Sequence, residues 1–308
     1  MPGPPHVFAL SDDGELTYGS FHPSDQGYVF EARHSERLSD EIFGQGVLGA
    51  PLREPHLFAD QLKDFLARLP AEVGEATLIL PDSWLRLTFT EVAELPAKAQ
   101  AQEEVLRFML KRLVPFRVED LRVSASEVTP FPAQQEPRRI LLGFAIDLLV
   151  SQLEDAFAEA GVTIGQITNT TLAMLTSLER RIGTGLAALA AVHSNAYVLC
   201  FFRAGEPLLY RYKSLEDMPE DVQRRTVHRE LRMTLSFVQE HFPDAALERV
   251  FLAAPEDREH QWLNWLGGEF GVIPEALGPE HFALARTQLG SSWPETAAML
   301  GAAMIEVG

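Results

Sequence analysis

Hydrophobic and polar positions alternate in short runs at the start of the chain. Residues 6–10 and 15–21 are predicted to form two strands, joined by the turn Ser11-Asp12-Asp13-Gly14. Glycine adopts the positive φ that tight turns require, so an Asp-Gly pair between two hydrophobic runs is a strong hairpin signal. A polar, glycine-rich passage follows. A helix is then predicted over about 57–69, where hydrophobic residues recur on one helical face.

The middle of the chain changes repeatedly between the strand period and the helix period. Strands are predicted over 76–80, 84–92, 121–128, 140–146 and 162–168, and helices over 100–114, 147–160 and 170–182. Pro115 and Gly161 are the predicted helix stops. In the helix over 100–114, the helical period predicts that five side chains face the core: Val105, Leu106, Met109, Leu110 and Leu113. The block 76–168 is therefore predicted to form an α+β insert within a larger chain.

The rest of the chain repeats the order of strands followed by helices. Strands are predicted over 189–192, 197–203, 208–212, 249–253 and 272–273, and helices over 220–241, 259–270 and 294–305. Because this order occurs twice, we predict two related α/β halves. The first half comprises 1–75 and 169–185. The second comprises 186–308, and its last helix is expected to return to the first half.

The length of 308 residues suggests roughly two domains. The charge of the chain limits its partners. Aspartate and glutamate total 44 against 26 lysine and arginine, which gives a formal net charge of −18. A field of this sign repels phosphate backbones, so nucleic acid is not an expected partner. It also opposes general adsorption to anionic lipid, although local basic patches remain possible.

Hydropathy and cysteine usage predict a cytoplasmic protein. The single cysteine, Cys200, lies in a hydrophobic run and is expected to be a buried strand thiol. No run reaches the roughly 20 clean apolar residues of a transmembrane helix. The first residues show neither the basic region nor the hydrophobic region of a signal peptide.

Known catalytic motifs are missing from the sequence. Gly44-Gln45-Gly46-Val47-Leu48-Gly49 has the letters of a dinucleotide fingerprint, but that site needs a strand before it and a helix after it. Pro51 follows at once, so we interpret the segment as a loop, with dinucleotide binding as the alternative. The nine histidines are scattered, and no metal site or catalytic residue is nominated.

The order of elements resembles one family. Ala76-Thr-Leu-Ile-Leu-Pro-Asp-Ser83, followed by Glu94-Leu95-Pro96, is similar to the opening of the inserted subdomain of PilM-type pilus assembly proteins. Leu113-Val114-Pro115-Phe116-Arg117-Val118-Glu119-Asp120 is similar to their "(I/V)PF…ED" signature, and Met299-Leu300-Gly301-Ala302-Ala303-Met304 to their closing helix. The resemblance covers most of the chain and is best over 76–182. It implies an α/β actin-like fold of two halves, shared with the division protein FtsA and related to the cytoplasmic domain of the secretion protein GspL.

In that fold, three loops surround a nucleotide, and this chain departs from the family pattern in each. The positions concerned are Ser11, Asp12, Asp13 and Gly14, then His193, Ser194 and Asn195, and last Ala253, Ala254 and Pro255. The resemblance implies an Asp-Ile-Gly sequence in the first two loops and a glycine run in the third. Losing the second aspartate removes the carboxylate that would organise Mg²⁺ and water. Losing the glycines puts side chains where backbone N–H groups would approach phosphate. ATP and Mg²⁺ are therefore not expected cofactors.

The resemblance favours an adaptor of a type IV pilus or type II secretion assembly. Such a protein would dock on the cytoplasmic tail of a bitopic inner-membrane protein, a PilN-like partner, and would be peripheral to that membrane. An assembly ATPase is a further candidate partner. In the relatives the tail lies in a groove beside the inserted subdomain. The candidate groove residues here are Phe116, Arg138, Arg139 and Leu141. The alternatives are an active actin-like ATPase with atypical loops, and an unrelated α/β enzyme.

Overall fold

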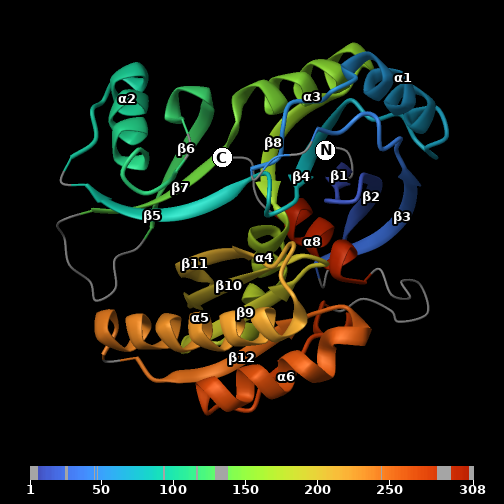
Figure 1. Cartoon of the computed structure of the whole chain (residues 1–308). Helices are drawn as coiled ribbons and strands as arrows, with labels where there is room; N and C mark the ends of the chain where they lie inside the picture. Colours follow the sequence, from blue (N-terminus) through green and yellow to red (C-terminus); the bar gives the residue numbers. More distant parts are fainter. Residues whose placement is uncertain are drawn as a thin grey trace.

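Two five-stranded sheets of identical strand order form the body of the molecule (Figure 1). This computed structural model describes residues 6–24, 27–44, 46, 48–92, 94–115, 117–128, 138–243, 245–282 and 293–304. The first sheet has the order β3-β2-β1-β4-β8 and consists of β1 (His6–Leu10), β2 (Glu15–Ser24), β3 (Gly27–Arg37), β4 (Glu75–Leu80) and β8 (Thr163–Asn169). The second has the order β11-β10-β9-β12-β13 and consists of β9 (Leu186–Val192), β10 (Ala196–Arg203), β11 (Glu206–Ser214), β12 (Leu247–Ala253) and β13 (Glu275–Ala276).

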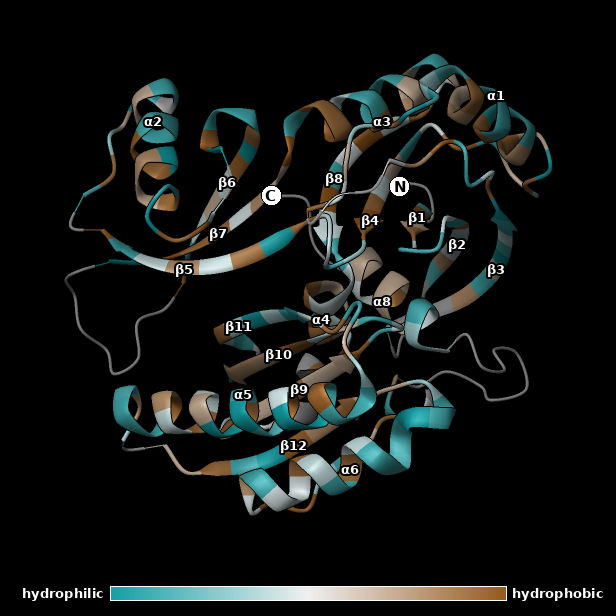
Figure 2. Ribbon diagram, viewed as in Figure 1, coloured by the Kyte–Doolittle hydropathy of each residue, from teal (hydrophilic) through white to brown (hydrophobic). Residues whose placement is uncertain are grey.

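The pairing pattern is also the same in the two sheets. In each, the first three strands in the chain are antiparallel neighbours. The fourth strand then pairs parallel to the first, and the fifth parallel to the fourth. β9 and β10 are buried along almost their whole length. Figure 2 colours these two strands as mostly hydrophobic. The two halves therefore have one topology, used twice.

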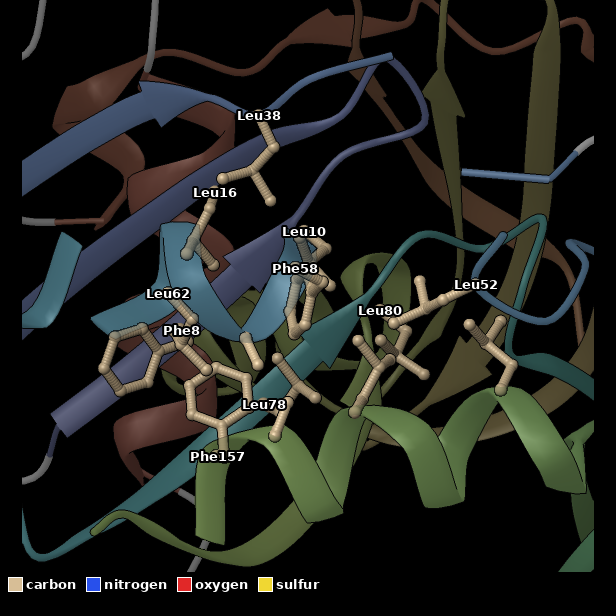
Figure 3. Close-up of a cluster of buried hydrophobic side chains, with 14 of the residues drawn as sticks. Phe8, Leu10, Leu16, Leu38, Leu52, Phe58, Leu62, Leu78, Leu80 and Phe157 are labelled. Atoms are coloured by element: carbon tan, nitrogen blue, oxygen red, sulfur yellow. The ribbon is translucent and has the colours of Figure 1, made fainter. Parts of the chain in front are cut away.

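Helices cover both faces of each sheet. The first half contributes α1 (Pro55–Leu66), α3 (Asp147–Glu159) and α4 (Thr170–Ile182), and the second α5 (Glu220–His241), α6 (Glu256–Phe270) and α8 (Trp293–Met304), with a short 3₁₀ helix η2 (Pro279–Phe282). α1 and α3 cover the outer face of the first sheet, where Phe8, Phe58 and Phe157 belong to one hydrophobic cluster (Figure 3). α5 and α6 cover the outer face of the second sheet. Leu231 of α5 and Trp262 of α6 belong to the hydrophobic cluster on that face.

α4 and α8 pack against each other between the two sheets. Their cluster includes Ile79 from the first sheet, Phe251 from the second and Met299 from α8 itself. The two helices approach so closely that a β-carbon added at Gly301 would lie 1.7 Å from the carbonyl oxygen of Ala173. The centre of the molecule therefore depends on a position where only glycine fits.

A third, smaller sheet forms the insert. It has the order β5-β7-β6 and consists of β5 (Arg86–Val92), β6 (Leu121–Val128) and β7 (Arg138–Ile146), covered by α2 (Ala99–Leu110) and a short 3₁₀ helix η1 (Val118–Asp120). Leu106, Leu110 and Leu142 belong to its core. The predicted insert boundaries, 76–168, are too wide. β4, α3 and β8 belong to the first half, because their hydrophobic side chains pack in its core rather than against the small sheet.

Several sequence-based predictions need correction. β3 was not predicted, because it is an edge strand whose polar residues are mostly half-buried and follow no hydrophobic alternation. Leu113 is exposed rather than inward, since α2 ends at Leu110 and the chain turns there. The last short strand is at 275–276, and Ile273 is almost fully exposed.

The expectations for Cys200 and for the segment 44–49 are met. Cys200 is buried, and burial raises the pKa of its thiol to about 12. The described residues of the segment 44–49 form a loop and begin no helix. Among the helices the structure describes, none combines the length and hydrophobicity that crossing a bilayer needs.

Candidate functional site

A cleft of about 770 Å³ lies between the two halves. The turn between β1 and β2 lines it with Ser11, Asp12 and Asp13, although Gly14 of the same turn is buried away from it. The turn between β9 and β10 adds His193, Ser194 and Asn195, and the β12–α6 connection adds Ala253, Ala254 and Pro255. The repeated topology explains this meeting, because β1 and β9 are equivalent strands of the two sheets and β12 pairs parallel to β9.

Carboxylates dominate the charge of the cleft. The acidic side chains that line it are Asp12, Asp13, Glu15, Glu256, Glu259 and Glu295, and none of its described lining residues is a lysine or an arginine. α6 begins directly after Pro255 with Glu256, Asp257 and Glu259 in its first turn. A helix N-terminus attracts phosphate through its free N–H groups and its dipole. Here the carboxylates in the first turn of α6 occupy that position and repel a phosphate. The cleft is therefore unfavourable for a polyphosphate.

Backbone N–H groups of the loops are engaged within the turns. The N–H of Gly14 donates to the Ser11 carbonyl at 3.1 Å, and the N–H of His193 donates to the Ala196 carbonyl at 2.9 Å. Pro255 has no N–H to donate. Phosphate loops hold their ligand through several converging N–H groups, and these two turns use such donors internally.

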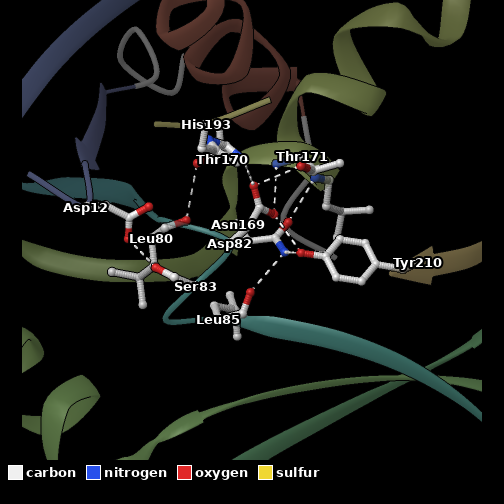
Figure 4. Close-up of polar contacts among 11 residues, drawn as sticks. Asp12, Leu80, Asp82, Ser83, Leu85, Asn169, Thr170, Thr171, His193 and Tyr210 are labelled. Carbon is white, nitrogen blue, oxygen red and sulfur yellow. Dashed lines mark hydrogen bonds and ion pairs between the residues drawn. The ribbon is translucent and has the colours of Figure 1, made fainter. Parts of the chain in front are cut away.

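Asp82 is the centre of a buried polar network beside the cleft, and no sequence motif marked it as a site residue. It follows β4, and its side chain is 1% exposed. Thr171 at the start of α4 donates its hydroxyl to Asp82 at 2.8 Å. Tyr210 of β11 donates its hydroxyl to the same carboxylate, also at 2.8 Å (Figure 4). Asp82 therefore joins the first half to the second.

His193 completes this network from the second half. Its Nε2 lies 3.1 Å from Asp82 Oδ2. Burial alone would lower the pKa of His193, but the carboxylates of Asp82 and Asp12 outweigh it and raise the pKa above the ordinary 6.5. Burial and the Asp82 carboxylate also raise the pKa of Tyr210 well above its usual range. The histidine that stands where the resemblance implies an aspartate thus serves as the partner of a buried carboxylate.

The three candidate groove residues that the structure describes have different surroundings. β7, which carries Arg138, Arg139 and Leu141, is the central strand of its sheet, so the prediction that its edge accepts a peptide is wrong. Arg139 reaches the second half, where it donates to the Leu208 carbonyl, and it stacks on Phe89 of β5 with 4.4 Å to the ring centroid. Arg138 pairs with Glu127 at 3.6 Å. Phe116 lies outside the described residues.

Leu141 instead lines a different groove, between β8 and the insert sheet, with a volume of about 650 Å³. β8 is at the edge of the first sheet, so its outer backbone groups pair with no other strand that the structure describes. The groove also contains Gln166 and Thr168, whose Oε1 and Oγ1 atoms are buried without a hydrogen-bond partner. We refer to it as the β8 groove.

Metal binding finds no support in the described part of the chain. There, no three or more histidine, cysteine, aspartate or glutamate side chains are grouped so that they could hold an ion.

Solved structures share this fold. Neither a protein-family model nor a curated protein matches the chain. The PilM–PilN type IV pilus biogenesis complex matches with a TM-score of 0.72 and 20% identity, over 97% of this chain and 97% of that chain. A Bacteroides thetaiotaomicron protein with an actin-like ATPase fold and unknown function matches with a TM-score of 0.55 and 12% identity, over 96% and 95%. The cytoplasmic domain of EpsL, an inner-membrane component of the Vibrio cholerae type II secretion system, matches with a TM-score of 0.50 and 14% identity, over 96% and 94%. The predicted α/β actin-like fold is confirmed.

Proposed function

We propose that this chain is an adaptor of a type IV pilus-like or type II secretion-like assembly. It docks on the cytoplasmic tail of a bitopic, PilN-like inner-membrane protein, remains cytoplasmic itself, and does not hydrolyse ATP. The observation that carries the proposal is the β8 groove. The PilM–PilN complex, with which the chain shares its fold over 97% of its length, supports the class of assembly.

The β8 groove has the properties of a site for an extended peptide. An edge strand offers a row of backbone donors and acceptors to which one further strand can add. Leu85, Leu87 and Leu172 supply hydrophobic contacts for alternate side chains. The buried oxygens of Gln166 and Thr168 have no partner, and rotation of these two side chains toward the groove would let them accept N–H groups of the peptide. Burying such atoms without partners is costly, so a bound strand would relieve that cost.

Filling the β8 groove should abolish tail binding. Ser124 and Ser126 are exposed on β6 and point into the groove. The double variant Ser124→Trp and Ser126→Trp is expected to weaken binding of a labelled tail peptide from the PilN-like protein of the same organism by at least about tenfold, because the indoles occupy the space of the peptide. Fluorescence anisotropy measures the affinity.

Glu127→Trp, on the same strand and exposed beside Arg138, is the matched control and should bind like the unmodified protein. Equal affinity of the double variant and the control would place the docking site elsewhere. Circular dichroism of both variants checks that the fold is intact.

Calorimetry with Mg-ATP should show no binding tighter than about millimolar, since the N–H groups of Gly14 and His193 are engaged within their turns and Pro255 has no N–H to offer a phosphate. The carboxylates of Glu256 and Glu259 at the start of α6 add repulsion. A dissociation constant in the micromolar range would contradict the adaptor without ATPase activity. It would favour the second candidate, an active ATPase with atypical loops, for which the cleft volume of about 770 Å³ is sufficient.

A further inference from the structure

Phe108 and Leu113 form an exposed hydrophobic spot on the insert. Phe108 of α2 is 68% exposed and Leu113, just after the helix, is 48% exposed. The inward side of the same helix is already filled, since Leu106 and Leu110 are buried in the core of the insert. The exposure of Phe108 is therefore not the result of a loosely packed helix, and it needs another explanation.

Basic residues lie next to this spot on its C-terminal side. The segment 107–117 contains Arg107, Lys111, Arg112 and Arg117 and no carboxylate, in a chain whose net charge is −18. Lys111 caps the C-terminus of α2 and Arg112 follows in the turn, both exposed, while the exposed Glu104 precedes Phe108 by one helical turn. Neither Lys111 nor Arg112 makes an ion pair with any residue in the described ranges, whereas Arg107 pairs with Glu103 and Arg117 with Asp120. We call Phe108, Lys111, Arg112 and Leu113 the α2 patch.

The helix dipole does not account for the α2 patch. Cations near a helix C-terminus are favourable, which would explain Lys111 and Arg112 alone. It would not explain an exposed phenylalanine next to them. α5 offers a comparison, because it too is rich in arginine, but Arg225 pairs with Asp221 at 2.8 Å and Arg232 with Glu269 at 3.1 Å. These arginines of α5 have carboxylate partners, and Lys111 and Arg112 of the α2 patch have none in the described ranges.

We propose that the α2 patch binds the surface of an anionic lipid bilayer. An aromatic ring next to an ammonium and a guanidinium matches the bilayer interface, where the ring enters the acyl boundary and the cations meet phosphate. An acidic protein surface would satisfy the cations but leave the Phe108 ring against charged groups. In Figure 1, α2 lies on the outer side of the insert, away from the second half. The acidic remainder of the molecule is repelled by the same lipids, so the insert is turned toward the membrane.

Vesicle co-sedimentation of the purified chain tests this inference. The chain should bind vesicles of phosphatidylglycerol and phosphatidylcholine at low salt, and should not bind vesicles of phosphatidylcholine alone. The triple variant Phe108→Ser, Lys111→Ser and Arg112→Ser should partition at least about 100-fold more weakly, from the loss of two cations and one inserted ring. The charge-only variant Lys111→Glu and Arg112→Glu should lose binding as well.

The matched control is placed on α5, where Arg224, Arg225 and Met233 are also exposed. Replacing these three by serine makes the same change of charge and should leave partitioning within about twofold. No binding to the anionic vesicles, or an equal loss in the α5 control, overturns the inference. So does a self-association, seen by analytical ultracentrifugation, that the α2 variant abolishes without any lipid binding. The α2 variants should keep the affinity of the β8 groove for the tail peptide, so this test is independent of the docking proposal.

Discussion

Gly301→Ala is expected to lower the free energy of unfolding by about 3 kcal/mol. The added β-carbon would lie 1.7 Å from the carbonyl oxygen of Ala173 and 2.7 Å from its carbonyl carbon. These are backbone atoms of α4, which no side-chain rotation can move. Relief requires α8 to separate from α4, which opens the cluster that Met299 and Ala302 help to fill. Urea denaturation measures the change.

Gly268→Ala is the matched control for this change. Gly268 is also within a helix, but it is exposed on α6, and a β-carbon there would meet no atom within 4 Å. Alanine is the better helix former, so this variant should be more stable by up to about 1 kcal/mol. A Gly301→Ala protein as stable as the unmodified chain would contradict the close approach of α4 and α8.

Asp82→Ala should cost about 3 kcal/mol of stability, since it removes a buried carboxylate that accepts two hydrogen bonds and pairs with His193. The change also leaves the Tyr210 and Thr171 hydroxyls without their acceptor. Both halves lose their shared polar contact beside the cleft. The same urea titration gives the size of the effect. A loss below about 1 kcal/mol, the scale of an exposed pair, would contradict the burial of this network.

The pH dependence distinguishes this ion pair from simple packing. The pKa of His193 is raised above its ordinary value of 6.5 in the folded protein. Its contribution to stability is therefore fully present below pH 6.5 and is lost as the pH rises through the folded pKa. The unmodified chain should show this decline relative to Asp82→Ala, in which the carboxylate that retains the proton is gone. Parallel curves for the two proteins would contradict the assignment.

Local patterns predicted the elements whose signals are local. The helix over 170–182 was predicted with its observed bounds, and it begins with a cap in which the Asn169 side chain accepts the N–H of Leu172 at 2.9 Å. Gly183 ends it with a positive φ. The hairpin at Asp13-Gly14 is explained in the same way. The polar strand β3 was not predicted, because its side chains do not alternate between hydrophobic and polar.

The buried network could not be predicted in this way. Pro81-Asp82 has the local appearance of a turn that ends a strand, and turns are usually exposed. Asp82 is buried only because Tyr210 and His193 reach it from the other half of the molecule. The insert boundaries were predicted wrongly for the same reason. β4 pairs with β8, which follows the insert in the sequence, and neither strand has a local pattern that predicts this pairing.

The connection from the fourth strand to the next helix differs sharply between the two halves, and this difference bears on how the molecule arose. In the second half, only Ala254 and Pro255 link β12 to α6. In the first half, the equivalent link from β4 to α3 is residues 81–146. Arg86 pairs with Phe144, so the added segment leaves and re-enters the domain at one place. Tandem duplication of an ancestral unit accounts for the shared strand order, and expansion of this loop in one copy accounts for the insert. Such a loop can acquire a new surface while both ancestral units keep their strand order.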